Sequence, residues 1–283
     1  MYGRAHKTTG LTLIEMTLVL GTMILLVGLS VPAVRSLTRS FQSEGAVKSM
    51  IDAALSSARA MAMTRQRYVG VRFQKLCVSD DSANPLKGLP EAPQYMIFIM
   101  SDERGKMGGL GDGFRAVDGL DPIKLPGTVE VLDVDRDGIT RIARDADIDE
   151  LPELSNATTF SVVFGPSGRL VVHDVQVRNR QGYNRPTTGL VPATASSDDV
   201  FNVADTICRL RQGRFIQDDY PLGDAVQALG LGEEASRTHF VIAESMPLRA
   251  AYAQKTAWTG YLSSLRARTI YVSSYTGHLI PSD

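Results

Sequence analysis

One long apolar segment near the amino terminus constrains this chain more than any other feature. From Leu11 to Val34 the sequence runs through 24 residues with a single charged side chain, that of Glu15. As an α-helix the segment is about 36 Å long, enough to cross a hydrocarbon core about 30 Å thick. The preceding residues include Arg4 and Lys7 and no acidic residue, a bias that keeps them in the cytoplasm. The sequence therefore predicts one membrane span, with the rest of the chain outside the cytoplasm.

Glu15 needs a partner or a function, because a carboxylate inside an apolar segment costs about 2.5–3.5 kcal/mol on insertion scales. A plain membrane anchor leaves this cost unexplained. A secretory signal peptide is a second interpretation, since Val31-Pro32-Ala33 loosely resembles a small-residue cleavage site. The length of the segment and its basic leader argue against a buried core helix.

The order of leader, glycine, glutamate and apolar run resembles the processing motif of type IV prepilins. The matching residues are Gly10-Leu11-Thr12-Leu13-Ile14-Glu15, and residues 1–10 correspond to the leader. The resemblance implies that a prepilin peptidase cleaves between Gly10 and Leu11 and that Leu11 is then N-methylated. Members of the family more often have Phe at the first mature position, so Leu11 is a mild departure. Pro32 falls where many pilins kink this helix.

The same resemblance implies a role for Glu15 in assembly. After cleavage, each subunit carries a charged amine at Leu11, which the Glu15 carboxylate of a neighbouring subunit can neutralise. Such pairing favours a staggered stack of helices. The partners implied are the prepilin peptidase, other pilins or pseudopilins, the inner-membrane assembly platform and an exported substrate. The location implied is the bacterial inner membrane, with a single pass and the globular part on the periplasmic side.

The pattern after Val34 predicts an α+β fold. Apolar residues three or four apart extend the helix as an amphipathic segment over 35–65, which should dock on a globular domain over 66–283. Beyond residue 65 the apolar period changes to two, which indicates a mainly antiparallel β-sheet. The strands expected are 67–73, 95–100, 129–134, 159–164, 170–175, 239–243 and 269–273. Residues 101–122 and 178–197 are expected as loop insertions, and 245–268 as a helical hairpin or broken helix.

The passage from helix to strand over residues 53–71 resembles pseudopilins of the GspH/FimT kind. The hairpin over 164–171 and the ending over 270–280 are also similar to that group, whereas the middle of the chain is longer. The resemblance implies a pilin-like fold and a structural role as a minor pseudopilin of a type II secretion system. A type IV pilus minor pilin that binds DNA or another ligand is one alternative. A simply anchored or secreted globular protein is another.

An acidic run suggests calcium as a cofactor. Asp133, Asp135 and Asp137 precede Gly138 in the D-x-D-x-D-G pattern with which calcium-binding loops begin. The twelfth loop position, which should supply a bidentate carboxylate, is Arg144. A calcium site and a solvated acidic turn both remain open interpretations.

Cys77 and Cys208 are the two cysteines of the chain. Export would place both in an oxidising compartment, where they could form a disulfide. Because the bridge would close a long loop, it would contribute roughly 4–5 kcal/mol in the chain-entropy model. Two free buried thiols are the alternative.

Motifs and charge argue against an enzyme and against nucleic-acid binding. The 283 residues include 30 Lys and Arg against 31 Asp and Glu, without the basic excess typical of nucleic-acid-binding proteins. Gly165-Pro166-Ser167-Gly168 lacks the spacing of a nucleophile elbow, and the sequence has neither a phosphate-binding loop nor a dinucleotide fingerprint. Two arginine groups could still form a local basic patch: Arg178, Arg180 and Arg185, and Arg209, Arg211 and Arg214.

Overall fold

The computed structural model describes residues 13–101, 114–133, 150–176, 199–202, 207–208, 211, 213–216, 233–256, 261, 264–265 and 269–281. The chain forms two compact units, Met1–Gly45 and Ala46–Asp283. Helix α1 (Leu13–Arg65) contributes residues to both units. Every described strand belongs to the second unit.

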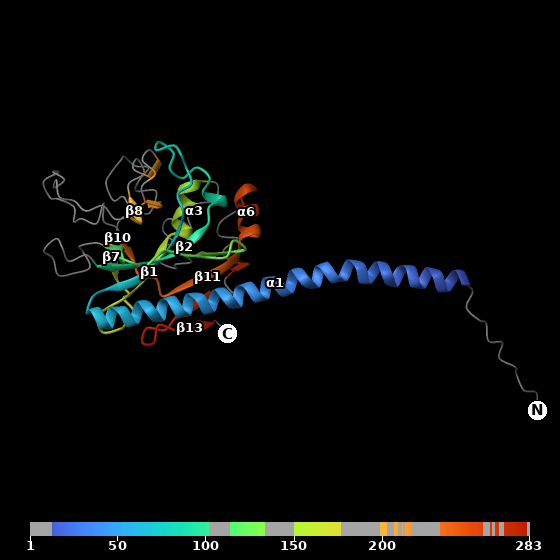
Figure 1. Ribbon diagram of the computed structural model, residues 1–283, viewed down its shortest axis with the longest axis horizontal. Helices are drawn as coiled ribbons and strands as arrows, with labels where there is room; N and C mark the ends of the chain where they lie inside the picture. Colours follow the sequence, from blue (N-terminus) through green and yellow to red (C-terminus); the bar gives the residue numbers. More distant parts are fainter. Residues whose placement is uncertain are drawn as a thin grey trace, which may run out of the picture. The chain divides into compact units, whose positions relative to one another are not determined.

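The second unit is α+β with mainly antiparallel strand pairing, as the sequence predicts (Figure 1). After α1, its helical elements are η1 (Leu89–Glu91), α3 (Leu151–Thr158) and α6 (Ser245–Ala253). Its strands are β1 (Val69–Lys75), β2 (Gln94–Ser101), β3 (Phe114–Ala116), β4 (Ile123–Lys124), β5 (Val129–Leu132), β6 (Phe160–Phe164), β7 (Asp174–Gln176), β8 (Phe201–Asn202), β9 (Phe215–Ile216), β10 (Glu233–Ala235), β11 (His239–Glu244), β12 (Thr269–Val272) and β13 (Leu279–Pro281).

Two sheets dominate the second unit. The first has the strand order β3-β2-β1-β6, with β4 also paired to β2. The second has the order β13-β12-β11-β5. All pairs within these two sheets are antiparallel. Among the described strands, the short pair β8–β9 is parallel.

Most of the expected strands are present, with ends displaced by at most two residues. The exception is the strand expected at 170–175, which is wrong over most of its length. Leu170 makes a single bridge with Phe164, and β7 begins only at Asp174. The reason is that the edge of β6 is already occupied beyond this bridge, because the Val163 amide donates to the Ser236 hydroxyl at 2.8 Å and the Ser161 carbonyl accepts from the Arg237 amide at 2.8 Å.

The expected loop insertion over 101–122 contains a strand, which is a second correction. Phe114 and Ala116 are buried on either side of Arg115, and this alternation lets β3 pair with β2. Residues 102–113 and the other insertion, 178–197, lie outside the described residues.

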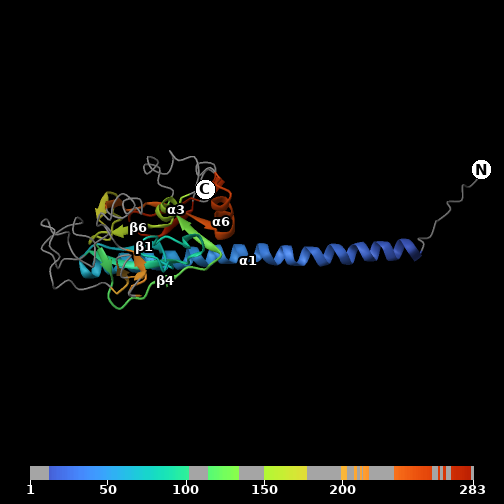
Figure 2. The same ribbon diagram turned by 90° about the horizontal axis from the view of Figure 1, so that it is seen from above.

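The part of α1 in the second unit packs on both large sheets. Its residues Val47, Ile51, Leu55, Ala58 and Ala62 are fully buried and recur at the helical spacing of three and four. They share one hydrophobic cluster with residues of β1, β6, β11 and β12. Figure 2 shows β1 and β6 beside this carboxyl-terminal part of α1. The helix therefore packs against strands of both sheets, which also contact each other directly through Phe73 and Phe240, whose ring centroids are 5.8 Å apart.

The first sheet is covered on its other face as well. A separate hydrophobic cluster there joins side chains of β2, β3, β8 and β9. As a result every residue of β1 is buried, including the polar ones. Arg72 is accommodated because its Nε donates to Gln74 Oε1 at 2.9 Å and its Nη1 to Ser161 Oγ at 3.1 Å.

Two turns contact α1 closely: the turn that follows β6 and the turn that joins β12 to β13. Arg59 Nε donates to the carbonyl of Gly168 at 2.9 Å, and Gly168 has the left-handed φ of 75° that glycine tolerates. Asp52 Oδ1 accepts from the Leu279 amide at 2.9 Å, and His278 Nδ1 lies 3.1 Å from Asp52 Oδ2. These contacts hold the hairpin over 164–171 and the ending over 270–280 against α1.

Candidate functional site

The processing motif lies at the start of the chain, where the structure describes little. Gly10 and Leu11 lie outside the described residues, and Glu15 and Pro32 fall within α1 without described side chains. Cleavage at Gly10, methylation of Leu11, the assembly role of Glu15 and the kink at Pro32 therefore stay predictions.

The residues that follow Glu15 expose an unusual amount of apolar surface. Their side chains are between 46% and 68% exposed, although all are large and hydrophobic: Met16, Leu18, Val19, Leu20 and Met23. They project in different directions around α1, since successive residues of an α-helix are rotated by about 100°. Within the described part of the chain, no helix meets the combined length and hydropathy needed to cross a bilayer.

The acidic run places its first aspartate in an ion pair. Asp133 follows β5 and is buried, and its Oδ2 lies 2.7 Å from Arg237 Nε. Its backbone amide donates to the Ala157 carbonyl at 2.8 Å. Asp135 and Asp137 lie outside the described residues, and the described residues hold no cluster of three metal-ligating side chains. Arg237 neutralises the Asp133 carboxylate, which favours a structural role for this aspartate.

The two cysteines lie together although the sequence separates them widely. Both are free thiols in this structure, Cys77 half-buried at the end of β1 and Cys208 buried. Burial, together with the smaller effect of the neighbouring Cys208, raises the pKa of Cys77 to about 11. Burial also raises the pKa of Cys208, while a hydrogen bond from Cys77 opposes that rise. The structure thus brings together the pair that the sequence singled out, without a bond between them.

A group of buried charges beside Cys77 was not expected from the sequence. Lys75 Nζ lies 2.9 Å from Glu130 Oε2 and also donates to the carbonyls of Leu89 and Pro90, each at 3.2 Å. Arg249 Nε lies 3.7 Å from Glu130 Oε1. No local pattern marks these residues, because Lys75, Glu130 and Arg249 come from β1, β5 and α6, and only the tertiary fold brings them together.

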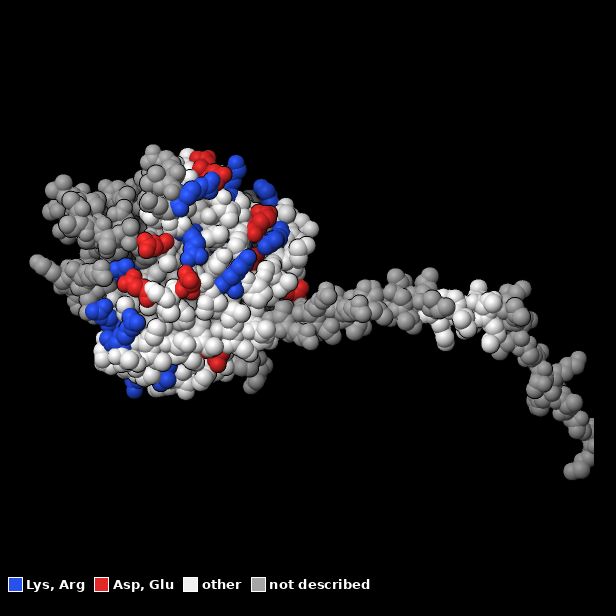
Figure 3. Space-filling view, in the orientation of Figure 1, with Lys and Arg blue, Asp and Glu red and all other residues white. Residues whose placement is uncertain are grey.

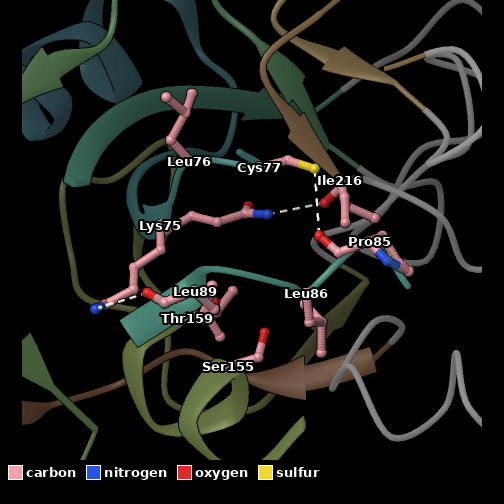
Figure 4. Close-up of a pocket in the computed structure, with 10 residues that line it drawn as sticks. Lys75, Leu76, Cys77, Pro85, Leu86, Leu89, Ser155, Thr159 and Ile216 are labelled. Carbon is pink, nitrogen blue, oxygen red and sulfur yellow. Dashed lines mark hydrogen bonds between the residues drawn. The ribbon is translucent and has the colours of Figure 1, made fainter. Parts of the chain in front are cut away.

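A small cavity opens between the end of β1 and the segment that carries η1 (Figure 4). Its volume of about 20 Å³ leaves room for about one water molecule. The side chains and backbone around it include Gln74, Lys75, Cys77, Leu89 and Ile216. Figure 4 shows the Cys77 sulfur directed at the Pro85 carbonyl, 3.4 Å away. The cavity suits an internal water better than an organic substrate.

The arginine groups do not stand out as a basic patch where they are described. Arg211 Nη2 lies 2.6 Å from Asp80 Oδ1, and Arg214 Nη2 lies 3.5 Å from Asp121 Oδ1. The other members of the two groups lie outside the described residues. Figure 3 shows Lys and Arg interspersed with Asp and Glu on the visible face. Asp80 and Asp121 thus offset the charges of Arg211 and Arg214, which a DNA phosphate backbone would otherwise attract.

Comparisons of the chain with models of protein families, with curated proteins and with solved structures give no match.

Proposed function

We propose that this protein is a pilin-like structural subunit, a minor pseudopilin of a type II secretion system. The observation that carries the proposal is the exposed apolar surface of α1 over residues 16–23, directly after the Gly10-to-Glu15 motif. Apolar surface left in water costs about 25 cal/mol per Å², so such a helix needs lipid or other helices around it. A pilus-like assembly provides both, lipid before assembly and neighbouring helices after it.

The proposed processing explains the charge inside the apolar segment. Prepilin peptidase cleaves after Gly10, and the exposed amine at Leu11 is methylated. Glu15 of a neighbouring subunit then pairs with that amine, so neither charge is buried alone. In this proposal the protein sits in the bacterial inner membrane with a single pass, and residues 46–283 lie on the periplasmic side. Its partners are the peptidase, other pseudopilins, the assembly platform and an exported substrate.

The same helix that would assemble also forms part of the folded core. Residues Val47–Ala62 of α1 supply one wall of the main hydrophobic cluster. This arrangement supports a structural subunit, because the proposed assembly segment continues directly into the folded domain. The protein itself would be a substrate of the peptidase and would carry no catalytic site.

The proposal is tested by the intact mass and amino-terminal sequence of the protein purified from its native membrane. The expected chain begins at Leu11 and carries one added methyl group. A chain that begins near Val34 would indicate a secretory signal peptide, and an uncut Met1 would indicate a plain anchor. Either result contradicts the proposal.

Matched variants sharpen the test. Gly10→Val should abolish cleavage, whereas Gly21→Val, in the same apolar segment, should leave cleavage unchanged because a side chain at Gly21 meets open space. Glu15→Ala should still be cleaved but should fail to enter a pseudopilus, scored by crosslinking to other pseudopilins. Normal assembly of Glu15→Ala would contradict the pairing with the Leu11 amine.

A further inference from the structure

The end of β1 and the segment around β9 lie far apart in the sequence, but hydrogen bonds and an ion pair hold them side by side near the two cysteines. The Cys77 amide donates to the Arg214 carbonyl at 3.1 Å, and Gln74 Nε2 donates to the Ile216 carbonyl at 2.9 Å. The guanidinium of Arg211 forms an ion pair with Asp80 at 2.6 Å. The end of β1 and the segment around β9 therefore run together over several residues.

The two thiols meet inside this junction. Cys208 belongs to the helical turn Ile207–Cys208, whose Ile207 carbonyl accepts from the Arg211 amide at 3.1 Å. Ile207 packs in the same hydrophobic cluster as Cys77. Each thiol lies close enough to the other to influence its pKa. A disulfide needs this proximity, and here the backbone contacts on both sides already supply it.

We propose that Cys77 and Cys208 are a redox pair that is oxidised to a disulfide by exchange with the disulfide of a second protein. The Cys77 thiol loses its proton and attacks one sulfur of that disulfide, giving a mixed disulfide and a thiol on the second protein. The Cys208 thiol then loses its proton and attacks the Cys77 sulfur, which releases the second thiol of that protein. Two electrons and two protons pass to the second protein, which ends as a dithiol.

The different exposure of the two cysteines indicates which thiol attacks first. Cys77 is partly exposed, so an external disulfide can reach it. Cys208 is only 5% exposed, so it is placed to attack from within. The disulfide would link the segment around β9 covalently to the end of β1. That segment covers the face of the first sheet opposite α1. Only the identity of the compartment in which this happens rests on the proposed export of the chain.

The test uses the full-length chain, purified in detergent and reduced, with oxidised glutathione as the probe. The expected product has lost both titratable thiols, and its mass is about 2 Da lower because two hydrogens are removed. A proteolytic digest without reductant should contain one peptide pair joined through Cys77 and Cys208. The oxidised chain should unfold at a temperature on the order of 10 °C above that of the reduced chain.

Two single variants test the order of steps. Cys208→Ser should accumulate a mixed disulfide of glutathione with Cys77, because the resolving thiol is absent. Cys77→Ser should react at least tenfold more slowly. Neither variant should show the shift in unfolding temperature. Glutathione on both cysteines of the unaltered chain, or two thiols that stay free while the urea-unfolded chain is oxidised, would overturn the proposal.

A measurement on protein trapped in cells separates this proposal from the proposed function. Thiols are blocked with an alkylating agent before lysis, and the bridged fraction is then counted. A chain that is bridged supports both proposals. A chain that forms the bond with glutathione but stays reduced in cells would contradict export, while the redox pair itself would stand.

Discussion

Lys75 Nζ and Glu130 Oε2 lie 2.9 Å apart and join the two large sheets through a buried ion pair. The two side chains are only 1% and 3% exposed. Lys75 ends β1 in the first sheet, and Glu130 lies in β5 of the second. The ammonium group also donates to two carbonyls of the η1 segment, so its charge is matched on several sides. Gln94 of β2 makes a second polar connection between the sheets, because its Nε2 donates to the Val131 carbonyl of β5 at 2.8 Å and its Oε1 accepts from the Val131 amide at 2.7 Å.

Breaking this pair should destabilise the fold strongly. Lys75→Met leaves the Glu130 carboxylate buried without its main partner, and the free energy of unfolding should fall by about 3–5 kcal/mol. Replacing both residues, as Lys75→Met with Glu130→Leu, should cost less than the sum of the single changes. Urea unfolding followed by circular dichroism measures each value. Asp118→Ala is the control, because its ion pair with Arg115 is largely exposed on the Asp118 side and should cost less than about 1 kcal/mol. Additive single changes would contradict the coupling.

The stability of the same variant should depend on pH more strongly than that of the unaltered chain. Burial raises the pKa of Glu130, and the nearby positive charge of Lys75 opposes that rise. Without Lys75 the pKa of Glu130 rises further, so the folded state holds a proton that the unfolded state loses near the ordinary value. Stability of Lys75→Met should therefore be greatest below the unfolded pKa of Glu130 and fall as pH rises through its folded pKa.

Urea midpoints between pH 4.5 and 8 test this dependence. The stability difference between Lys75→Met and the double variant Lys75→Met with Glu130→Gln isolates the carboxyl group, because the second change removes its titration. That difference should change with pH in the direction given above. A difference that is constant with pH would show that Glu130 does not titrate in this range.

How far the sequence predicts this fold can be judged at β1. The apolar residues Val69, Val71 and Phe73 alternate, and this alternation predicts both the strand and its core face. The burial of Arg72 on the opposite face was not predictable, since alternation with polar residues is typical of a solvated face. The side chains that cover Arg72's face include those of β8 and β9, which are short and lie in the part of the chain without clear periodicity.

Of the candidate sites, too, one could be predicted from the sequence and another could not. The cysteine pair could be singled out because a chain with two cysteines offers only one bridge. The ion pair of Asp133 with Arg237 could not, because the two residues are 104 positions apart and the D-x-D-x-D-G pattern points to a cation instead. Sequence patterns report local spacing, whereas these partners are set by how β5 and β11 meet in the second sheet.

A methyl group at Gly70 should disrupt the pairing of β1 with β6. A Cβ there would lie 2.5 Å from the backbone oxygen of Val162, which cannot rotate away as a side chain does. Gly70→Ala should therefore lower the free energy of unfolding by about 2–3 kcal/mol, in the range typical of overpacked cores. Gly127→Ala is the matched control, because a Cβ at Gly127 meets no atom within 4 Å. Thermal unfolding of both variants gives the comparison, and equal unfolding temperatures would show that β6 moves aside freely.

Calcium and Arg237 are alternative partners for the Asp133 carboxylate, and their effects can be separated. If Arg237 is the partner, as the 2.7 Å ion pair indicates, Asp133→Ala should destabilise the chain by about 2–3 kcal/mol in chelator and in calcium alike. The change leaves a guanidinium that is 15% exposed without this carboxylate, and calcium cannot replace it. Thermal unfolding with EDTA and with calcium checks the expectation for Asp133→Ala and for Asp135→Ala. A calcium-dependent gain in the unaltered chain that both variants abolish would instead make the acidic run a calcium site.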